Sequence, residues 1–230
     1  MKFILSRNED YKSHSKKWIV GYGFLFWLIS RIVAMIIMGV CLFVYDKYGI
    51  NPRELTNFGG DPTVTLSSRG LLRAVLMTAL IAPVFEELLF RFGLSFRKVS
   101  VGISLACVAL FYAFSHNKTA TLIVWIISCS IAIAIFCCIY FATKNEFWQQ
   151  KKIIWQIPAI WISSIAFGLV HLLAFSSLSW ILLPYALATC LIPFFAGCSC
   201  AYLRVNIGFG WGLAMHIFNN IPGIIIMFCS

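Results

Sequence analysis

Residues 120–142 read ATLIVWIISCSIAIAIFCCIYFA and contain no charged side chain. A helix crosses the hydrocarbon core of a bilayer in about 20 apolar residues, and this stretch is long enough to do so. Other apolar runs of similar length lie on both sides of it. These runs predict an all-α polytopic membrane protein.

The composition of the whole chain agrees with that class. Hydrophobic residues make up 61% of the sequence and charged residues 11%, whereas a soluble domain usually carries about 25% charged residues. The net charge of +10 comes from bases that lie mostly between the apolar runs. There is no basic-aromatic module of the nucleic-acid-binding kind. We therefore expect membrane lipid, and no nucleic acid, as a partner.

The apolar runs predict about seven membrane helices. Residues 1–17 form a polar N-terminal segment, and residues 18–230 are expected to form a single membrane domain. The longest hydrophilic connection covers residues 46–69 and contains the turn-forming residues Pro52, Gly59, Gly60 and Pro62. The predicted helices cover residues 18–45, 70–94, 99–116, 120–142, 155–176, 180–203 and 207–229.

The distribution of Lys and Arg predicts an orientation. Bases are concentrated in the N-terminal segment and in every second connection after it, and cytoplasmic connections are the ones that carry excess Lys and Arg. We therefore expect a multi-pass protein of the cell membrane, inner or plasma, with a cytoplasmic N-terminus. Seven spans would put the C-terminus outside.

Adjacent carboxylates occur inside the second predicted helix, in the stretch APVFEELLFR over residues 82–91. Ionisable residues within a bilayer are costly and usually functional. Glu87 and Arg91 are four residues apart, so they share one helix face and can pair. Glu86 is rotated by about 100° and points elsewhere.

Two histidines lie in later apolar runs. Phe167 precedes His171 by one helical turn, and Asn220 follows His216 by one turn. If the fifth helix starts at Pro158, then Glu86, His171 and His216 each lie about 18–20 Å below the cytoplasmic face. Proline is favoured in the first turn of a helix, which supports that start.

These residue types suit the activation of water. A carboxylate in a low-dielectric site is a competent general base, and a neutral histidine can orient the same water or bind a metal. The second histidine and the asparagine amide can donate hydrogen bonds to a developing oxyanion. Every role that peptide hydrolysis requires therefore has a candidate residue.

The three motifs, in this order, resemble those of the CAAX-protease and bacteriocin-processing family, also called Abi, which includes the Ras-converting CAAX endopeptidase. The family pattern is EExxxR, FxxxH and HxxxN. The resemblance implies that Glu86 and His171 activate the water and that His216 and Asn220 form the oxyanion site. It also implies that Glu87 and Arg91 hold the geometry. The similar regions cover roughly residues 80–98 and 160–222.

The resemblance does not decide whether the protein binds a metal. Relatives are often labelled metalloproteases, so a divalent ion such as zinc is a candidate cofactor, and its ligands would be Glu86, His171 and His216. The chain lacks the HExxH motif of the zincins.

Two residues have alternative interpretations. His116 is a rival for the second motif, but Tyr112 stands where the motif has Phe, so His171 is preferred. Arg31 lies inside the first predicted helix, where it either pairs with the glutamates or snorkels to the membrane interface.

The sequence therefore favours an intramembrane endopeptidase whose substrate is an unidentified peptide or membrane protein. The alternatives are a non-proteolytic protein on the same scaffold, such as a bacteriocin-immunity or membrane assembly protein, and a small transporter. A transporter usually shows internal symmetry between its halves, and this chain shows none.

Overall fold

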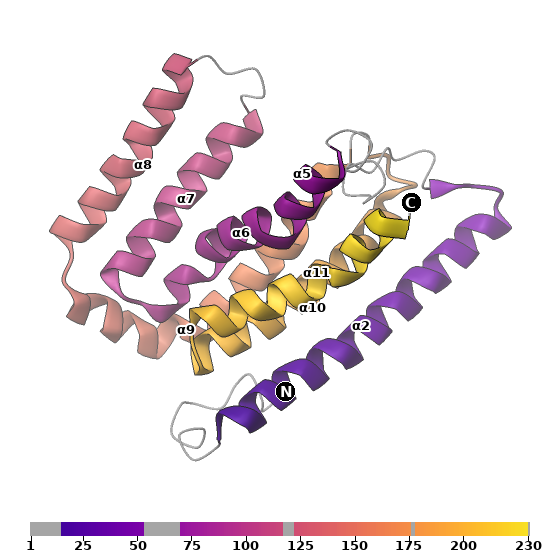
Figure 1. Ribbon diagram of the computed structural model, residues 1–230, viewed down its shortest axis with the longest axis horizontal. Coiled ribbons are helices and arrows are strands. Elements are labelled where there is room, and N and C mark those ends of the chain that lie inside the picture. The colour runs from indigo at the N-terminus through magenta and orange to yellow at the C-terminus, as the bar shows by residue number, and fades with distance from the viewer. Residues whose placement is uncertain (1–14, 53–69, 117–121, 176–177, 230) are drawn as a thin grey trace. The chain divides into compact units, whose positions relative to one another are not determined.

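The structure is a computed structural model that describes residues 15–52, 70–116, 122–175 and 178–229. The elements in this part of the chain are helical (Figure 1). Five of the described helices are long and apolar enough to cross a membrane, and α7, Lys98–His116, contains a shorter apolar helix. The all-α class is thus confirmed for the described residues, and these helices suggest a multi-pass membrane protein, while seven spans and the orientation of the chain stay predictions.

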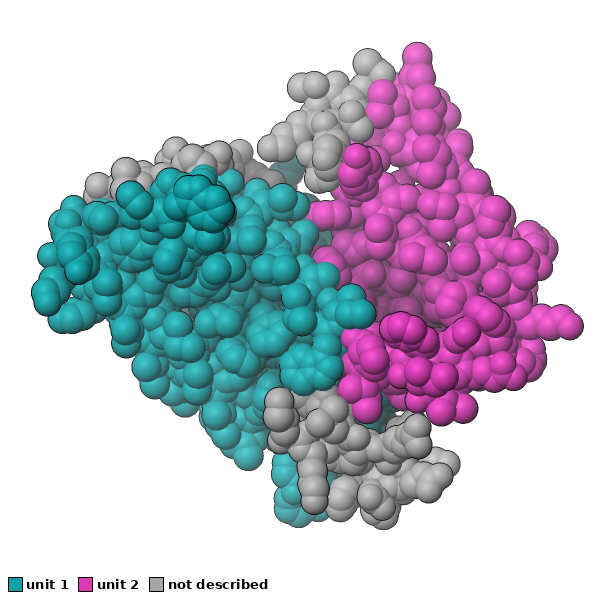
Figure 2. Space-filling model, turned by 180° about the vertical axis from the view of Figure 1, so that it is seen from behind, with its two compact units in different colours: residues 1–83, 161–230 teal, residues 84–160 magenta. Residues whose placement is uncertain are grey.

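The chain divides into two compact units (Figure 2). Unit 1 contains residues 1–83 and 161–230, and unit 2 contains residues 84–160. Two elements run from one unit into the other: α6, Ala82–Phe90, and α9, Asn145–Val170. The single membrane domain predicted over residues 18–230 stays a prediction.

Unit 1 is built around α10, Leu183–Asn206, which contacts both α2, Lys16–Lys47, and α11, Phe209–Cys229. Helix α2 comes before α10 in the chain and α11 comes after it, and all three run side by side in Figure 1. From Ile19 to Ala34 the buried residues of α2 recur every three or four positions, and Tyr45 follows eleven positions later, about three turns along the same helix face. They are Ile19, Gly23, Trp27, Ser30, Ala34 and Tyr45.

Gly23 shows why these helices pack closely. A Cβ atom at this position would lie 2.9 Å from Leu203 Cδ2 on α10. Glycine removes that clash and lets the two backbones approach, which is a common device where membrane helices pack. The core beside it includes Trp27, Cys200 and Met215.

Unit 2 contains the α7–α8 pair, in which α8 covers Leu122–Ala142. The η3 turn, Phe92–Ser95, joins α6 to α7 and packs against α7. The first part of α9 follows α8 after two residues. The bases Lys151 and Lys152 therefore lie on a helix rather than in an open connection.

The second predicted helix, residues 70–94, is built from consecutive segments. These are α5, Leu71–Leu76, then the π-helical segment η2, Met77–Ile81, and then α6. The α-helix ends at Phe90, and Arg91 lies outside it with φ −126°.

The predicted start of the fifth helix at Pro158 is wrong. Helix α9 begins at Asn145 and carries Pro158 in its interior. Proline is tolerated inside membrane helices, where neighbouring groups can satisfy the backbone that it frees, so its preference for the first turn did not locate the helix start. The equal-depth estimate for His171 loses its basis with this correction.

Candidate functional site

The FxxxH motif stands at the end of α9. His171 follows Val170, the last residue of α9, and begins the 3₁₀ turn η4, His171–Ala174. Its Nδ1 atom lies 2.8 Å from the carbonyl oxygen of Phe167. That carbonyl belongs to the last turn of the helix, where carbonyl groups have no partner within the helix. The four-residue spacing thus lets the histidine side chain cap its own helix.

This hydrogen bond determines the tautomer of His171. A carbonyl oxygen can only accept, so Nδ1 carries the hydrogen and donates it. In the neutral ring the lone pair is then on Nε2. A histidine held in this way presents Nε2 as a proton acceptor or a metal ligand.

Phe167 brings the second and third motifs together. Its ring is 2% exposed and meets the His171 ring edge-on, with centroids 5.1 Å apart. It meets the His216 ring of α11 in the same way, with centroids 5.3 Å apart. Both predicted histidines therefore contact one buried phenyl ring in unit 1.

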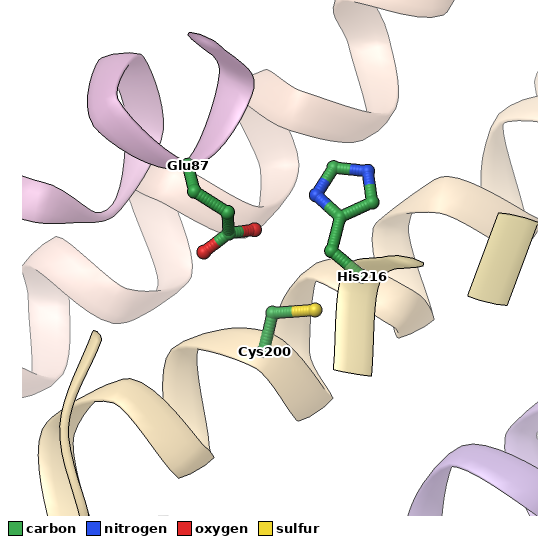
Figure 3. Close-up of side chains that lie close together, drawn as sticks. All are labelled: Glu87, Cys200 and His216. Carbon is green, nitrogen blue, oxygen red and sulfur yellow. The ribbon is translucent and has the colours of Figure 1, made fainter. Parts of the chain in front are cut away.

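His216 also lies beside a thiol. A ring nitrogen of His216 and the Cys200 sulfur lie within 4.8 Å of each other, and both side chains are buried (Figure 3). Glu87, drawn in the same view, comes from α6 in unit 2. Cys200 belongs to none of the three sequence motifs, and the contact between α10 and α11 brings it to His216.

Within unit 1 this pair does not by itself make a metal site. A thiol and an imidazole are both good zinc donors, but protein zinc sites use three or four protein ligands. The predicted divalent cofactor, with Glu86, His171 and His216 as ligands, stays a prediction.

Asn220, the last residue of the HxxxN motif, is bound to the main chain of another helix. Its Nδ2 atom donates to the carbonyl oxygen of Thr78 over 3.0 Å. Thr78 lies in the π-helical segment η2. The amide that was predicted to serve an oxyanion site thus has a structural acceptor.

The Thr78 carbonyl needs this donor because of Pro83. At the end of η2, the N–H of Ala82 donates to Met77 O, five residues back. The next amide nitrogen along the chain belongs to Pro83, which has no hydrogen to donate. The Thr78 carbonyl therefore has no backbone N–H five residues later to accept from. The side-chain amide of Asn220 supplies the missing donor. A polar group left unpaired away from water would cost about 1–3 kcal/mol.

The neighbouring residue, Asn219, forms a second connection. Its Oδ1 atom accepts from Trp27 Nε1 at 3.0 Å and from Arg31 Nη1 at 2.8 Å, both on α2. Its own amide donates to Asn220 Oδ1 at 3.3 Å. No spacing in the sequence predicted this network. Arg31 binds Asn219 within unit 1, while its pairing with the glutamates of unit 2 and its snorkelling to the interface stay alternative predictions.

The EExxxR motif forms a buried ion pair in unit 2. Arg91 Nη1 donates to Glu87 Oε1, and both side chains are 0% exposed. Such pairing is what makes burial of the two charges tolerable. The neighbouring Glu86 is partly exposed, as its different helix face requires.

Ser104 of α7 holds the end of α6. Its hydroxyl donates to Leu88 O at 2.7 Å and accepts from the Gly93 N–H at 2.8 Å. Leu88 is in the last turn of α6, so its carbonyl has no partner within the helix. One hydroxyl thus satisfies two backbone groups beside the Glu87–Arg91 pair. No sequence motif marks this serine.

No family model, curated protein or solved structure matches the chain. The resemblance to the CAAX-protease and bacteriocin-processing family thus rests on the three sequence motifs alone.

The rival second motif is only partly described. His116 is the last residue of α7, but its side chain lies outside the described part of the structure. Tyr112, one turn earlier, is exposed. The preference for His171 over His116 therefore rests on what His171 contacts, which is the same Phe167 ring that His216 contacts.

Proposed function

We propose that this protein is an intramembrane endopeptidase that hydrolyses a peptide bond with a water activated by Glu86 and His171. The observation that carries the proposal is the buried Phe167 ring, which contacts both His171 and His216. Two histidines from different membrane helices are costly to desolvate, and polar residues inside a membrane are usually retained for function.

The tautomer of His171 supports its role. With Nδ1–H bound to the Phe167 carbonyl, the basic Nε2 can take a proton from water or orient that water. His216 would stabilise the oxyanion that forms when the peptide carbonyl is attacked. A divalent metal, if bound, would supply the same electrophilic assistance.

The two glutamates would then have different tasks. Glu87 is bound in the buried pair with Arg91, so it would hold the local geometry. Glu86 lies on another face of α6 and would serve as the general base, which requires it to approach the two histidines. Cysteine cross-linking can test that approach, because disulfides form only when Cα atoms lie within about 7 Å of each other.

Matched variants at constant abundance test the activity. Glu86→Gln keeps the shape of the side chain but cannot act as a base, and loss of a general base typically costs about 10²–10⁴-fold in rate. His171→Ala and His216→Ala should abolish cleavage too, while His116→Ala should leave it unchanged. The measurement is complementation of a deletion strain together with a proteomic search for fragments that disappear with Glu86→Gln. Full function of all three variants at normal abundance would reject the proposal.

The bound state of Asn220 favours a second candidate, a non-proteolytic scaffold for immunity or membrane assembly. Its amide already donates to Thr78 O, so this motif residue has a structural task that explains its presence. For a scaffold, Asn220→Ala should lower activity only in proportion to abundance. For a protease, activity per molecule should fall as well.

A further inference from the structure

Arg31 lies in the middle of an unusually long membrane helix. Helix α2 has 32 residues, Lys16–Lys47, and is about 48 Å long, whereas a bilayer core takes about 20 residues. Every window of that length within α2 includes Arg31. Lys16 and Trp18 mark one end of the helix, and Tyr45 and Lys47 mark the other. Since amphipathic and basic residues of this kind anchor helix ends at the interface, Arg31 is placed inside the hydrocarbon core of the bilayer.

The protein contacts of Arg31 are electrically neutral. Nη1 donates to Asn219 Oδ1, and the guanidinium carbon lies 6.0 Å from the Trp27 ring centroid. Asn219 Oδ1 also accepts from Trp27, so both of its lone pairs are in use. A guanidinium has five N–H donors, and the side chain of Arg31 remains partly exposed.

The described part of unit 1 offers this cation no carboxylate. Its one acidic residue is Asp46, which lies on the same helix about 22 Å further along. A charge within the hydrocarbon core of a bilayer usually pairs with an opposite charge or faces a polar cavity. A neutral amide oxygen satisfies one donor, and the described residues of unit 1 offer no opposite charge to this cation.

We propose that Arg31 anchors a binding site for the oxyanion of an anionic amphiphile, with Trp27 and Asn219 holding the guanidinium in place. The planar guanidinium binds carboxylate and phosphate groups bidentately. The exposed apolar side chains Phe24, Leu28 and Phe218 lie on the two helices that carry these residues. They suit the hydrocarbon part of the same molecule.

Native mass spectrometry of the full-length chain tests this site. The chain is reconstituted in phosphatidylcholine nanodiscs that contain either phosphatidylglycerol, a phosphate source, or oleate, a carboxylate source. The fraction of protein ions that carry one anionic lipid is then measured. We expect at least one of the two lipids to be retained about tenfold more by the wild type than by Arg31→Gln. The matched control, Arg73→Gln, removes an exposed arginine of α5 in the same unit and should retain lipid like the wild type.

Two further variants ask whether Arg31 binds an anion or only joins α2 to α11 through Asn219. Asn219→Asp keeps the acceptor for Arg31 and supplies an internal counter-ion, so it should displace the lipid while the protein stays folded. Arg31→Lys keeps the charge but loses the bidentate fork, so retention should fall to an intermediate level. Size-exclusion chromatography checks folding in each case. Equal lipid retention by the wild type and folded Asn219→Asp, or by the wild type and folded Arg31→Gln, would overturn the proposal.

Discussion

Asn220 donates its side-chain amide to the carbonyl oxygen of Thr78, a backbone group that Pro83 prevents from pairing within its own helix. The bond joins α11 to the π-helical segment η2. A π-type turn places one extra residue in the helix and often occurs at functional sites. Here it stands between α5 and α6, directly before the helix that carries Glu86 and Glu87.

A double-mutant cycle on Asn220 and Pro83 tests this relationship. Asn220→Ala should lower the free energy of unfolding by about 1–3 kcal/mol, because the Thr78 carbonyl loses its partner. Pro83→Ala restores a backbone N–H that can bind the same carbonyl. The cost of Asn220→Ala should therefore be smaller in the Pro83→Ala background, by about 0.5 kcal/mol or more. Thermal unfolding in detergent measures the stability of the wild type, the two single variants and the double variant. Strictly additive effects would show that Asn220 does not take the place of the N–H that Pro83 lacks.

Ser104→Ala should destabilise unit 2. The change leaves the Leu88 carbonyl and the Gly93 N–H without the hydroxyl that binds both, at a cost of about 1–3 kcal/mol for each unsatisfied group. Thermal unfolding should show a clear fall in the transition temperature. Ser130→Ala is the matched control, because Ser130 is exposed and its hydroxyl donates to Ile126 O of its own helix. Equal transition temperatures for the two variants would show that Ser104 does not cap α6.

The Glu87–Arg91 pair predicts a rescue experiment. Glu87→Gln removes one charge of a fully buried pair, and leaving the other charge buried typically costs about 3–5 kcal/mol. Membrane abundance and the transition temperature should both fall. The double variant Glu87→Gln/Arg91→Gln removes both charges and should recover part of the loss. If the double variant is no better than the worse single variant, the two residues do not depend on each other as a pair.

Contacts between residues one helical turn apart were the part of the site that the sequence could predict. Glu87 with Arg91 and Phe167 with His171 are both four residues apart, and helix geometry places such residues side by side whatever surrounds them. The apolar runs likewise predicted the five described helices that are long and apolar enough to cross a membrane, because the length of such a run is set by the bilayer. Boundaries were less predictable: Pro158 lies inside α9 rather than at its start.

Contacts between helices could not be predicted in the same way. The bond of Arg31 to Asn219 joins residues at opposite ends of the chain, and no spacing rule connects them. The acceptor of Asn220 arises from a local π-type turn, whose position depends on Pro83 and on the packing of η2 against α11. The Cys200–His216 approach depends in the same way on how α10 and α11 pack.

A substitution at Gly168 tests how closely the C-terminal end of α9, next to His171, packs against α10. A Cβ atom here would lie 2.9 Å from Phe194 Cβ and 3.1 Å from Cys190 O, so Gly168→Ala must push the two helices apart. Overpacking of this kind typically costs about 1–3 kcal/mol. It should also reduce any activity that depends on Phe167 and His171, which flank the glycine. Gly21→Ala is the matched control: no atom of the described residues lies within 4 Å of its Cβ position, and alanine favours a helix over glycine by up to about 1 kcal/mol. Thermal unfolding should therefore rank Gly21→Ala at or above the wild type and Gly168→Ala below it, and the reverse order would refute close packing of α9 on α10.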